Sequence, residues 1–464
     1  MSFGPYQNLV HGILCALMSV NTLLAVTPGP LTVHSSNPRY FNDGTGRAVY
    51  CTGSHNWFNM QDQSCSDPPA VFDWPGHMDF LQNHNHSFTR GWHNETAMDY
   101  GAPDCNGISL GFYVYPMPFM RTGPGYALDG KLKFDINQYN QAYFDRIYER
   151  AADAASQGIY MGIMLFQGWS IDTKGITGRD PMFGHPFNID NNINGIDGDP
   201  NNDGEGLEIH TLQIPAITAI QEDYVVKVID ELNDLDNIIW EISNESHADS
   251  VQWQYHMIDF IKSYESAYKS KQHLVWMNGW NFDNTYLFGS PADVISPNRK
   301  DGTDYRNNPP ATTGNKIIVL DTDHIWGVGG NAPWVFKSFT RGYHPIFMDP
   351  IVTTSPTIDP MDPQWVVIRE AMGYARSYAD KMDLASMTPQ NSLSSTNYCL
   401  ANPGVEYFVY QPTAGASFTV NLSGGSYNYE WFNTSTGVIT NTGSFTFSGG
   451  SRSFTPPFST AAAA

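Results

Sequence analysis

The sequence has little positive charge. Lysine and arginine together number 24 among 464 residues, against 46 aspartates and glutamates, which leaves a formal net charge of −22 at pH 7. Proteins that bind nucleic acids or anionic membranes neutralise phosphates with lysine and arginine, so this balance argues against both kinds of partner. It favours a ligand that is neutral or cationic. No oligomeric state is predicted.

Long apolar stretches and cysteines are also scarce. The stretch at residues 12–26 is shorter than the roughly 20 residues that a helix needs to cross a bilayer, and Thr27-Pro-Gly-Pro follows it. This pattern predicts a signal peptide over residues 1–27 and a secreted or periplasmic protein that has no membrane segment after its removal. An oxidising compartment permits a disulfide between Cys65 and Cys105, with free buried thiols as the equally weighted alternative.

Short apolar runs alternate with helical patterns between about residues 38 and 385, which is typical of βα units around a parallel sheet. Eight runs qualify as strands: 48–52, 87–92, 160–167, 237–243, 273–278, 292–296, 316–320 and 345–348. Helices are expected over 140–157, 213–233, 248–268 and 363–382, with only short or irregular helices after the fifth and sixth strands. We therefore predict an α/β fold with a (β/α)8 TIM barrel over residues 36–387. A doubly wound open sheet is the alternative, but no Gly-x-Gly-x-x-Gly follows a strand.

The composition changes after Met387, where serine, threonine, glycine and asparagine dominate. Alternating runs at 405–410, 417–422 and 427–432 have the spacing of strands joined by turns. These features predict a small β-sandwich over residues 388–464. A domain of this size is near the lower limit of independent stability, so we expect it to pack on the barrel.

The fourth predicted strand ends on a candidate catalytic acid. Its apolar run stops at the polar pair Asn244-Glu245, and a parallel strand of a TIM barrel presents its last residues at the face where chemistry takes place. Glu245 is therefore a candidate catalytic acid. The alternative is a carboxylate that stabilises the N-terminus of the next helix, which is expected to open at 246–249.

The seventh strand runs into Asp321-Thr-Asp-His-Ile-Trp326, which places Asp321 and Asp323 at the same rim. A retaining glycosidase needs two carboxyl groups about 5–5.5 Å apart, one to protonate the leaving oxygen and one to attack the anomeric carbon. Glu245 and one of these aspartates can supply that pair.

Candidate substrate-binding residues follow other strand ends. They are His55, Trp57, Arg90, His93, Gln167, Trp169, Asn244, Trp280, His324 and Trp326. Tryptophan rings stack on sugar rings, and the rest can hydrogen-bond to sugar hydroxyls. Core packing is the commoner role for any single tryptophan. Four tryptophans at strand ends nevertheless indicate a sugar cleft.

The ending Glu241-Ile-Ser-Asn-Glu245 resembles that of strand four in clan GH-A, the large clan of (β/α)8 glycoside hydrolases. The resemblance implies an enzyme that hydrolyses O-glycosidic bonds in a polysaccharide or oligosaccharide, with Glu245 as general acid/base. It also implies that Asp323 rather than Asp321 is the nucleophile, and that Arg90 holds it ionised. The clan's nucleophile is usually glutamate, and aspartate is shorter by about 1.5 Å. Inversion, with Asp323 as the base that activates water, is therefore the alternative to retention.

Further motifs resemble a narrower group, secreted cellulase-like proteins with a C-terminal collagen-binding-type β module. The shared motifs are Asn37-Pro-Arg-Tyr-Phe-Asn-Asp-Gly, Thr52-Gly-Ser-His, Ser290-Pro-Ala-Asp-Val-Ile-Ser-Pro-Asn298, Asp321-Thr-Asp-His324 and Phe347-Met-Asp-Pro350. The resemblance implies a carbohydrate as the partner. Neither the charge nor the apolar pattern gives independent support to collagen binding.

Other kinds of site remain open. Asp321, Asp323, His324 and His247 are metal-ligand types at one rim, although neither His-x-His nor His-Glu-x-x-His occurs near them. A glycosidase of this kind requires no metal or cofactor. A carbohydrate-binding protein on an inactive barrel would keep the aromatic residues and lose a carboxylate, whereas both carboxylates are present here.

The insertion 187–209 contains Asp197-Gly-Asp-Pro-Asn-Asn-Asp-Gly-Glu-Gly. Acids at alternate positions can surround a structural Ca²⁺, although the spacing departs from that of an EF-hand. The alternative is a polar loop over the barrel mouth.

Overall fold

The computed structural model describes residues 29–57, 59–99, 111–172, 181–351, 359–459 and 462–463. The predicted signal peptide and Cys105 lie outside these residues. Within them, no helix combines the length and apolar character needed to span a bilayer. Cys65 is in a disulfide, and its pairing with Cys105 stays a prediction. Cys51 and Cys399 are free, buried thiols.

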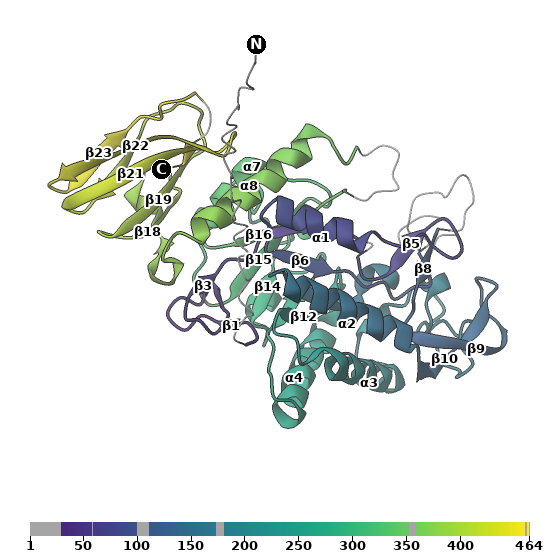
Figure 1. The fold of residues 1–464 in the computed structure, drawn as a ribbon. Helices are drawn as coiled ribbons and strands as arrows, with labels where there is room; N and C mark the ends of the chain where they lie inside the picture. Colours follow the sequence, from purple (N-terminus) through teal and green to yellow (C-terminus); the bar gives the residue numbers. More distant parts are fainter. Residues whose placement is uncertain are drawn as a thin grey trace, which may run out of the picture.

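Eight parallel strands form the barrel at the centre of the molecule (Figure 1). In chain order they are β4 (Gly53–His55), β6 (Phe88–Gly91), β11 (Tyr160–Gln167), β12 (Ile238–Asn244), β13 (Val275–Asn278), β14 (Val294–Ser296), β15 (Ile317–Asp321) and β16 (His344–Met348). From β6 to β16 each strand hydrogen-bonds to the next in the sheet, and β16 pairs with β4. The predicted barrel is confirmed.

The first strand, β4, meets the second, β6, where the barrel closes. The backbone N–H of Phe88 donates to the carbonyl of Thr52 at 3.2 Å, and Thr89 Oγ1 donates to the carbonyl of Ser54 at 3.0 Å. Glycine is required at position 53, because a Cβ there would lie 2.2 Å from the carbonyl oxygen of Phe88. The strands therefore approach each other more closely than a side chain would permit.

The predicted position of strand one, 48–52, is wrong. Ala48–Val49 is β3, which pairs with β2 (Phe41–Asn42), and β2 pairs with β1 (Thr32–Val33) in a small antiparallel sheet. Leu31 and Phe41 from this segment pack with Phe88 and Trp276 of the barrel strands. The apolar run that looked like a barrel strand therefore covers one end of the barrel instead.

Helices surround the barrel: α1 (Trp74–Asn83), α2 (Gln141–Ser156), α3 (Pro215–Leu232), α4 (Val251–Tyr268), α5 (Thr285–Phe288), α6 (Thr322–Ile325), α7 (Ala332–Thr340) and α8 (Pro363–Ala379). Proline at the first position and Asp362, which accepts a hydrogen bond from the backbone of Gln364, start α8. The four predicted helices are confirmed as α2, α3, α4 and α8. Only the short α5 follows β13, as expected for the gap after strand five.

Short 3₁₀ helices and two small sheets complete this part of the chain. The 3₁₀ helices are η1 (Gly168–Ser170), η2 (Pro181–Gly184), η3 (Leu207–His210), η4 (Ala248–Ser250), η5 (Leu384–Ser386) and η6 (Asn391–Leu393). One sheet joins β5 (Asp62–Ser64), β7 (Met98–Asp99) and β8 (Phe112–Tyr115), and the other joins β9 (Phe119–Tyr126) and β10 (Leu132–Tyr139). These insertions lie on the side of the barrel away from the C-terminal strands (Figure 1).

The C-terminal strands form a β-sandwich, as predicted. A six-stranded sheet contains β17 (Thr388–Pro389), β18 (Cys399–Asn402), β19 (Glu406–Gln411), β21 (Gly425–Asn433), β22 (Val438–Phe447) and β24 (Ala462–Ala463). A second sheet pairs β20 (Phe418–Leu422) with β23 (Gly450–Phe454). Trp431 and Phe418 meet edge to face in the core between the sheets.

This sandwich packs on two barrel helices (Figure 1). Phe339 of α7 meets Phe408 of β19 with ring centroids 5.2 Å apart, and Tyr378 of α8 meets Phe432 of β21 at 5.0 Å. The Tyr378 hydroxyl also donates to Glu430 at 2.7 Å. The two parts therefore share an apolar interface.

Candidate active site

The carboxyl ends of the barrel strands bring together a group of buried polar residues that we call the Arg90 network. It consists of Arg90 on β6, Glu241 and Asn244 on β12, Asp321 at the end of β15 and Asp323 in α6. All five side chains are buried. The barrel therefore assembles a charged centre from strands two, four and seven, which lie far apart in the chain.

Arg90 is the hub of this network. Its Nε donates to Oε2 of Glu241 at 2.8 Å, and its Nη2 donates to Oε1 of the same carboxylate. Its Nη1 lies 3.0 Å from Oδ2 of Asp321 and 3.0 Å from Oδ2 of Asp323. Burial alone would lower the pKa of Arg90, but Glu241 and the two aspartates raise it above the usual value. Arg90 is therefore permanently charged.

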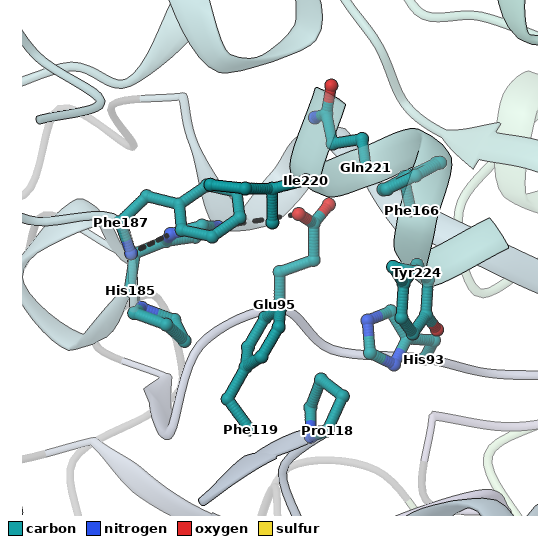
Figure 2. A pocket seen from close by; sticks show the side chains of 11 residues that line it. His93, Glu95, Pro118, Phe119, Phe166, His185, Phe187, Ile220, Gln221 and Tyr224 are labelled. Carbon is teal, nitrogen blue, oxygen red and sulfur yellow. Dashed lines mark hydrogen bonds and ion pairs between the residues drawn. The ribbon is translucent and has the colours of Figure 1, made fainter. Parts of the chain in front are cut away.

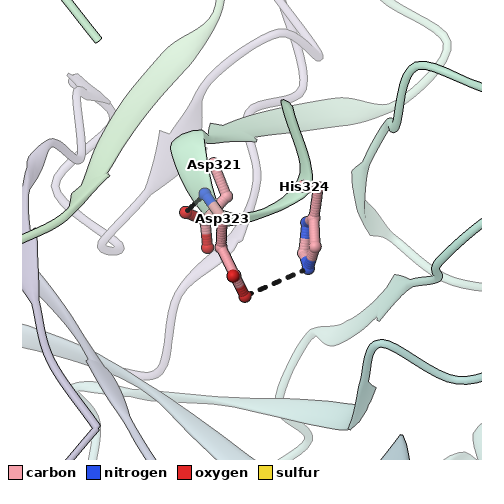
Figure 3. A group of neighbouring side chains, drawn as sticks. All are labelled: Asp321, Asp323 and His324. Atoms are coloured by element: carbon pink, nitrogen blue, oxygen red, sulfur yellow. Dashed lines mark hydrogen bonds and ion pairs between the residues drawn. The ribbon is translucent and has the colours of Figure 1, made fainter. Parts of the chain in front are cut away.

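Both oxygens of Asp321 already accept hydrogen bonds. Oδ2 accepts from Arg90, and Oδ1 lies 2.9 Å from Nε2 of His55. Oδ1 also accepts from the backbone N–H of Asp323 at 2.9 Å (Figure 3). Burial would raise the pKa of Asp321, but His55 and Arg90 together hold it below the usual range. Asp321 is ionised, and both of its oxygens are engaged with protein donors.

Asp323 has one oxygen open. The side chain is 5% exposed, Oδ2 accepts from Arg90 and lies 3.7 Å from His324 Nε2, and no described residue donates to Oδ1 (Figure 3). Burial and the negative charge of Asp321 raise the pKa of Asp323 to about 6, which outweighs the effect of Arg90. Arg90 was expected to hold this carboxylate ionised, and it does so only in part.

Asn244 and His324 connect the ends of five strands, β6, β11, β12, β14 and β15. Asn244 accepts from Arg90, lies 3.2 Å from His324 Nε2 and donates to Gln167 at 3.0 Å. The other His324 nitrogen, Nδ1, lies 3.0 Å from Ser296 Oγ. Burial lowers the pKa of His324 to about 3, so its ring is neutral. These contacts fix the orientation of four predicted substrate-binding side chains, those of Arg90, Gln167, Asn244 and His324.

Glu245 follows β12 in an uncommon backbone conformation. Its φ of +47° lies in the left-handed region, which costs a residue with a Cβ roughly 1–2 kcal/mol. Gly168 lies directly against it, because a Cβ at 168 would be 2.5 Å from the carbonyl oxygen of Glu245. Such a conformation at a non-glycine residue points to a function for the side chain. Glu245 is partly exposed, whereas Asn244 is buried.

The alternative role for Glu245, at a helix N-terminus, fits the structure poorly. The short 3₁₀ helix η4 begins at Ala248 and α4 begins only at Val251. Interaction with a helix dipole falls off beyond the first turn of the helix. Glu245 lies outside that turn.

A cavity of about 310 Å³ opens beside His324, and we call it the Trp280 cavity. Its lining residues are Trp280, Asn281, Asn298, Arg299, Lys300, Arg306, His324, Ile325 and Trp326. Trp280 is 45% exposed, and its backbone N–H donates to the carbonyl of Ser246 at 3.0 Å, next to Glu245. Trp326 packs edge-on against Trp334 with ring centroids 5.4 Å apart. Two predicted tryptophans therefore line one cavity, which is formed by residues that follow strands five, six and seven.

The other two predicted tryptophans lie elsewhere. Trp57 is partly buried and packs with Trp92, Met164 and Met348. Trp169 lies in η1, where its backbone N–H donates to Gln167 at 3.3 Å. Neither belongs to the lining of the Trp280 cavity.

His93 is separated from the Arg90 network. It lines a small cavity of about 20 Å³ with Glu95, His185 and Tyr224 (Figure 2). Its Nδ1 lies 2.8 Å from the hydroxyl of Tyr143, and burial lowers the pKa of His93 to about 4. A substrate-binding role for His93 has no support in these contacts.

Sequence reasoning missed two buried carboxylates as site residues. Glu241 lies inside an apolar strand and accepts hydrogen bonds from Arg90 and Asn278. A buried charge must be paired, so an acid within an apolar run is the sequence signal that could have identified Glu241. Glu95 accepts from the backbone N–H of Gln167 at 2.6 Å and lies 2.9 Å from His210 Nε2. It supports the end of strand three, and nothing in the residue spacing indicates this contact.

Arg90 competes with a metal ion for the same carboxylates. Asp321, Asp323 and His324 have ligand atoms within 4.8 Å of one another, the sole such group of histidine, cysteine and acidic residues in the described chain. Arg90 already donates to both carboxylates, and His324 Nε2 lies within hydrogen-bonding distance of Asn244. His247 lies 3.0 Å from the carbonyl of Leu207. With these contacts, the two carboxylates and the two histidines do not form a ligand set that fits a metal ion.

The acidic loop in the insertion binds its own backbone. Asp199 accepts from the N–H groups of Asp203 and Gly204 at 3.1 and 2.9 Å, and Asp203 accepts from the N–H of Glu205 at 2.9 Å. These hydrogen bonds hold the loop together through its carboxylates. A structural calcium ion at this loop stays a prediction.

Comparisons with known proteins agree on the fold. Residues 111–279 match the family model of DUF6298, a domain of unknown function, which is less than half of the chain. No curated protein matches the sequence. Among solved structures, one named only as a glycoside hydrolase is 12% identical with a TM-score of 0.57, covering 94% of this chain and 96% of its own. A family 5 glycoside hydrolase from Bacteroides vulgatus is 14% identical with a TM-score of 0.59, covering 94% and 92%. At such identities the similarity establishes the fold.

Proposed function

We propose that the protein is a glycoside hydrolase that cleaves O-glycosidic bonds in a polysaccharide or oligosaccharide. The observation that carries the proposal is that Glu245 and Asp323 follow strands four and seven and are linked through Asn244 and His324, of which His324 also lines the Trp280 cavity. The two neighbours of the same fold are named as glycoside hydrolases, which supports it. The sequence pattern of residues 1–27 makes secretion, or export to a periplasm, part of the proposal.

Asp323, and not Asp321, is the nucleophile in this proposal. A nucleophile needs an oxygen that can reach the substrate, and Asp323 Oδ1 has no donor among the described residues, whereas both oxygens of Asp321 are occupied. Asp321 and Arg90 act on its charge in opposite directions, and burial adds to the effect of Asp321. The resulting pKa near 6 leaves Asp323 mostly ionised at neutral pH.

In the first step, an oxygen of Asp323 forms a bond to the anomeric carbon as the glycosidic C–O bond breaks. Glu245 transfers its proton to the departing oxygen, so that the leaving sugar departs as a neutral alcohol. The products are a covalent glycosyl-aspartate and a Glu245 carboxylate. Asn244 and His324 are fixed beside both residues and can donate to sugar hydroxyls if substrate displaces their present contacts.

In the second step, the Glu245 carboxylate removes a proton from a water molecule, and that water attacks the anomeric carbon. The bond to Asp323 breaks and the free carboxylate returns. Each carboxyl group ends in its starting state, and the sugar keeps its anomeric configuration. If the two groups stand about 6.5–9.5 Å apart, Asp323 instead deprotonates a water and the configuration inverts.

The first experiment compares the full chain with its Glu245→Gln variant on a panel of polysaccharides and aryl glycosides. Loss of a proton donor costs about 10²–10⁴-fold in rate, so hydrolysis of natural substrates should fall by that factor. Aryl glycosides with an acidic phenol need no protonation, and the first step on them should survive in the variant. Glu149→Gln, at an exposed position on α2, is the matched control and should retain activity.

Equal loss on activated and natural substrates would assign Glu245 a role other than acid catalysis. A chain that binds sugars of the panel but hydrolyses none would instead be a carbohydrate-binding protein on a barrel scaffold. Near-normal turnover by Glu245→Gln would remove this residue from the mechanism.

A further inference from the structure

One wall of the Trp280 cavity is positively charged. Arg299, Lys300 and Arg306 all line it, although the whole chain has only 24 lysines and arginines and a net charge of −22. Arg299 and Lys300 are exposed, and Arg306 is partly buried. We call these three residues the cationic wall. Its charge is opposite in sign to that of the protein that surrounds it.

The cationic wall has no counterion within the described structure. Arg299 donates to the carbonyl of Ile325 at 3.5 Å, Arg306 donates to the same carbonyl, and Lys300 donates to the side-chain oxygen of Asn281 at 2.8 Å. No carboxylate of a described residue forms an ion pair with any of the three. Their charges are therefore hydrogen-bonded only to neutral oxygens.

Acidic residues near the wall are engaged with other groups. Asp301 accepts from the side chain of Asn284 at 2.8 Å and from the backbone of Thr303 at 2.9 Å. Asp304 accepts from the backbone of Asn307 at 3.0 Å. Burial and then the like charge of Arg299 lower the pKa of Arg306, with Asp304 opposing this weakly. Holding these cations together is unfavourable in the absence of an anion.

All three residues of the cationic wall lie on the loop between β14 and β15, and this loop is tied to the loop after β13. Asn298 is buried, and its side chain donates to the carbonyls of Gly279 and Phe282 at 3.1 Å each. Its Oδ1 accepts from the backbone N–H of Lys300 at 2.8 Å. The loop after β14, which carries Arg299 and Lys300, is thus fixed against the loop after β13, which carries Trp280. The backbone that carries these cations is therefore fixed beside Trp280.

Aromatic and catalytic groups stand beside the same wall. Trp280 and Trp326 line the cavity, and the guanidinium of Arg306 lies 5.4 Å from the Trp326 ring centroid. His324 also lines the cavity and connects it to Asp323 and Asn244. A sugar ring stacked on these tryptophans would place a charged substituent within reach of the wall. A neutral sugar would leave the cations unpaired.

We propose that the cationic wall binds an anionic substituent of the substrate, a sugar carboxylate or sulfate ester, in the subsite beside the catalytic pair. This inference rests on the proposed glycosidase function and narrows its substrates to acidic carbohydrates. Arginine suits planar, bidentate recognition of such groups, and a lysine adds a point charge. The net negative charge of the chain favours a neutral or cationic ligand. At the proposed sugar subsite the cationic wall gives the opposite local charge.

The test uses pairs of oligosaccharides that differ only in charge. One pair is a uronic-acid-containing oligosaccharide before and after reduction of its carboxylates to alcohols, and the other is a sulfated oligosaccharide before and after desulfation. Binding is measured by calorimetry with the Glu245→Gln variant of the full chain, and hydrolysis with the unmodified chain. We expect the charged member of one pair to bind about tenfold more tightly or better, because a charge-assisted contact is stronger than a neutral one.

The substitutions Arg299→Gln and Lys300→Gln, made together, should remove this preference and raise KM for the charged substrate about tenfold with kcat little changed. Arg47→Gln with Lys381→Gln is the matched control, since it also removes one arginine and one lysine. Both control residues are exposed and belong to one surface site, where Arg47 donates to the carbonyl of Asp380 at 2.8 Å. Unfolding midpoints of all variants establish that they remain folded.

Several results would overturn the inference. These are equal binding within both pairs, no binding of any charged oligosaccharide, or a preference that persists in the double variant. A shift of the pH–rate profile without a change in preference would show instead that the wall adjusts the charge of Glu245. If charged oligosaccharides bind through the wall and none is hydrolysed, the glycosidase proposal fails while the anion site stands. Which pair shows the preference distinguishes a carboxylate from a sulfate.

Discussion

Replacement of Arg90 by methionine tests the electrostatic balance of the site. Arg90 is fully buried and donates to three carboxylates, so its removal leaves three buried negative charges without their cation. Asp321 keeps His55 and a backbone N–H, and Glu241 keeps Asn278, whereas Asp323 loses the donor to its Oδ2. Breaking a buried ion pair by removing one partner costs about 3–5 kcal/mol, and we expect a loss of unfolding free energy in that range at neutral pH.

The loss should depend on pH in a defined direction. Without Arg90, Asp323 loses the positive charge that opposes burial and Asp321, so the pKa of Asp323 in the folded state rises further above its value in the unfolded chain. A carboxyl group of that kind binds more protons when folded, so its destabilising effect is smallest below the unfolded pKa, near 4, and grows as pH rises through the folded pKa. Arg90→Met should therefore lie closest to the parent in stability near pH 4.5 and furthest from it near pH 8.

Urea unfolding followed by tryptophan fluorescence at pH 4.5 and pH 8 measures both quantities. Lys227→Met is the control, because its ion pair with Glu231 is one helical turn away on the surface of α3 and is worth about 0.3–0.5 kcal/mol. A loss for Arg90→Met no larger than that of the control would refute the reasoning. So would a loss that is the same at both pH values, since buried, uncompensated carboxylates cannot behave in that way.

Four further predictions concern catalysis. Asp323→Asn should abolish turnover on natural and activated substrates, whereas Asp321→Asn should retain some, and the reverse order would exchange their roles. Attack requires an ionised Asp323, whose pKa is about 6, so kcat/KM should rise with pH through about 6. In Asp321→Asn this rise should move to lower pH, because the negative charge of Asp321 no longer raises the pKa of Asp323. A rise that stays in place would contradict the assignment. Proton NMR should find the first-formed product with the substrate's anomeric configuration, and the opposite anomer would indicate inversion. Gly168→Ala, whose Cβ would lie 2.5 Å from the carbonyl oxygen of Glu245, should displace the acid and lower turnover about a hundredfold, a result that unaltered kinetics would contradict.

Most of the barrel can be predicted from the sequence because its strands are buried on both faces. The run at 160–167 contains no polar amide or charged residue before its final Gln167, is buried throughout, and corresponds to β11 (Tyr160–Gln167). Strand one is the exception. Gly53–His55 has no apolar run, because its glycine is needed where the backbone meets Phe88, and the neighbouring run at Ala48–Val49 belongs to another sheet. A local hydrophobic pattern cannot distinguish these two cases.

The site is predictable only where a residue's position in its strand decides its role. Glu245 and Asp323 follow directly from strand ends. The paired state of Glu241, the open oxygen of Asp323 and the raised pKa of that residue all depend on distances between strands that are remote in the sequence. The position of the cationic wall relative to Trp280 depends on the loops after β14 and β13, which are joined by buried hydrogen bonds from Asn298. No spacing rule contains that information.

The left-handed backbone of Glu245 has a consequence for how this protein can evolve. Glycine adopts that conformation without the steric penalty that glutamate incurs, so Glu245→Gly should be tolerated by the fold. Glutamate and glycine codons differ by a single base. A lineage in which hydrolysis is no longer selected therefore has a short mutational route to a stable lectin-like descendant that retains the cavity and its tryptophans. Inactive relatives with glycine at this position are the sequences in which that history would be visible.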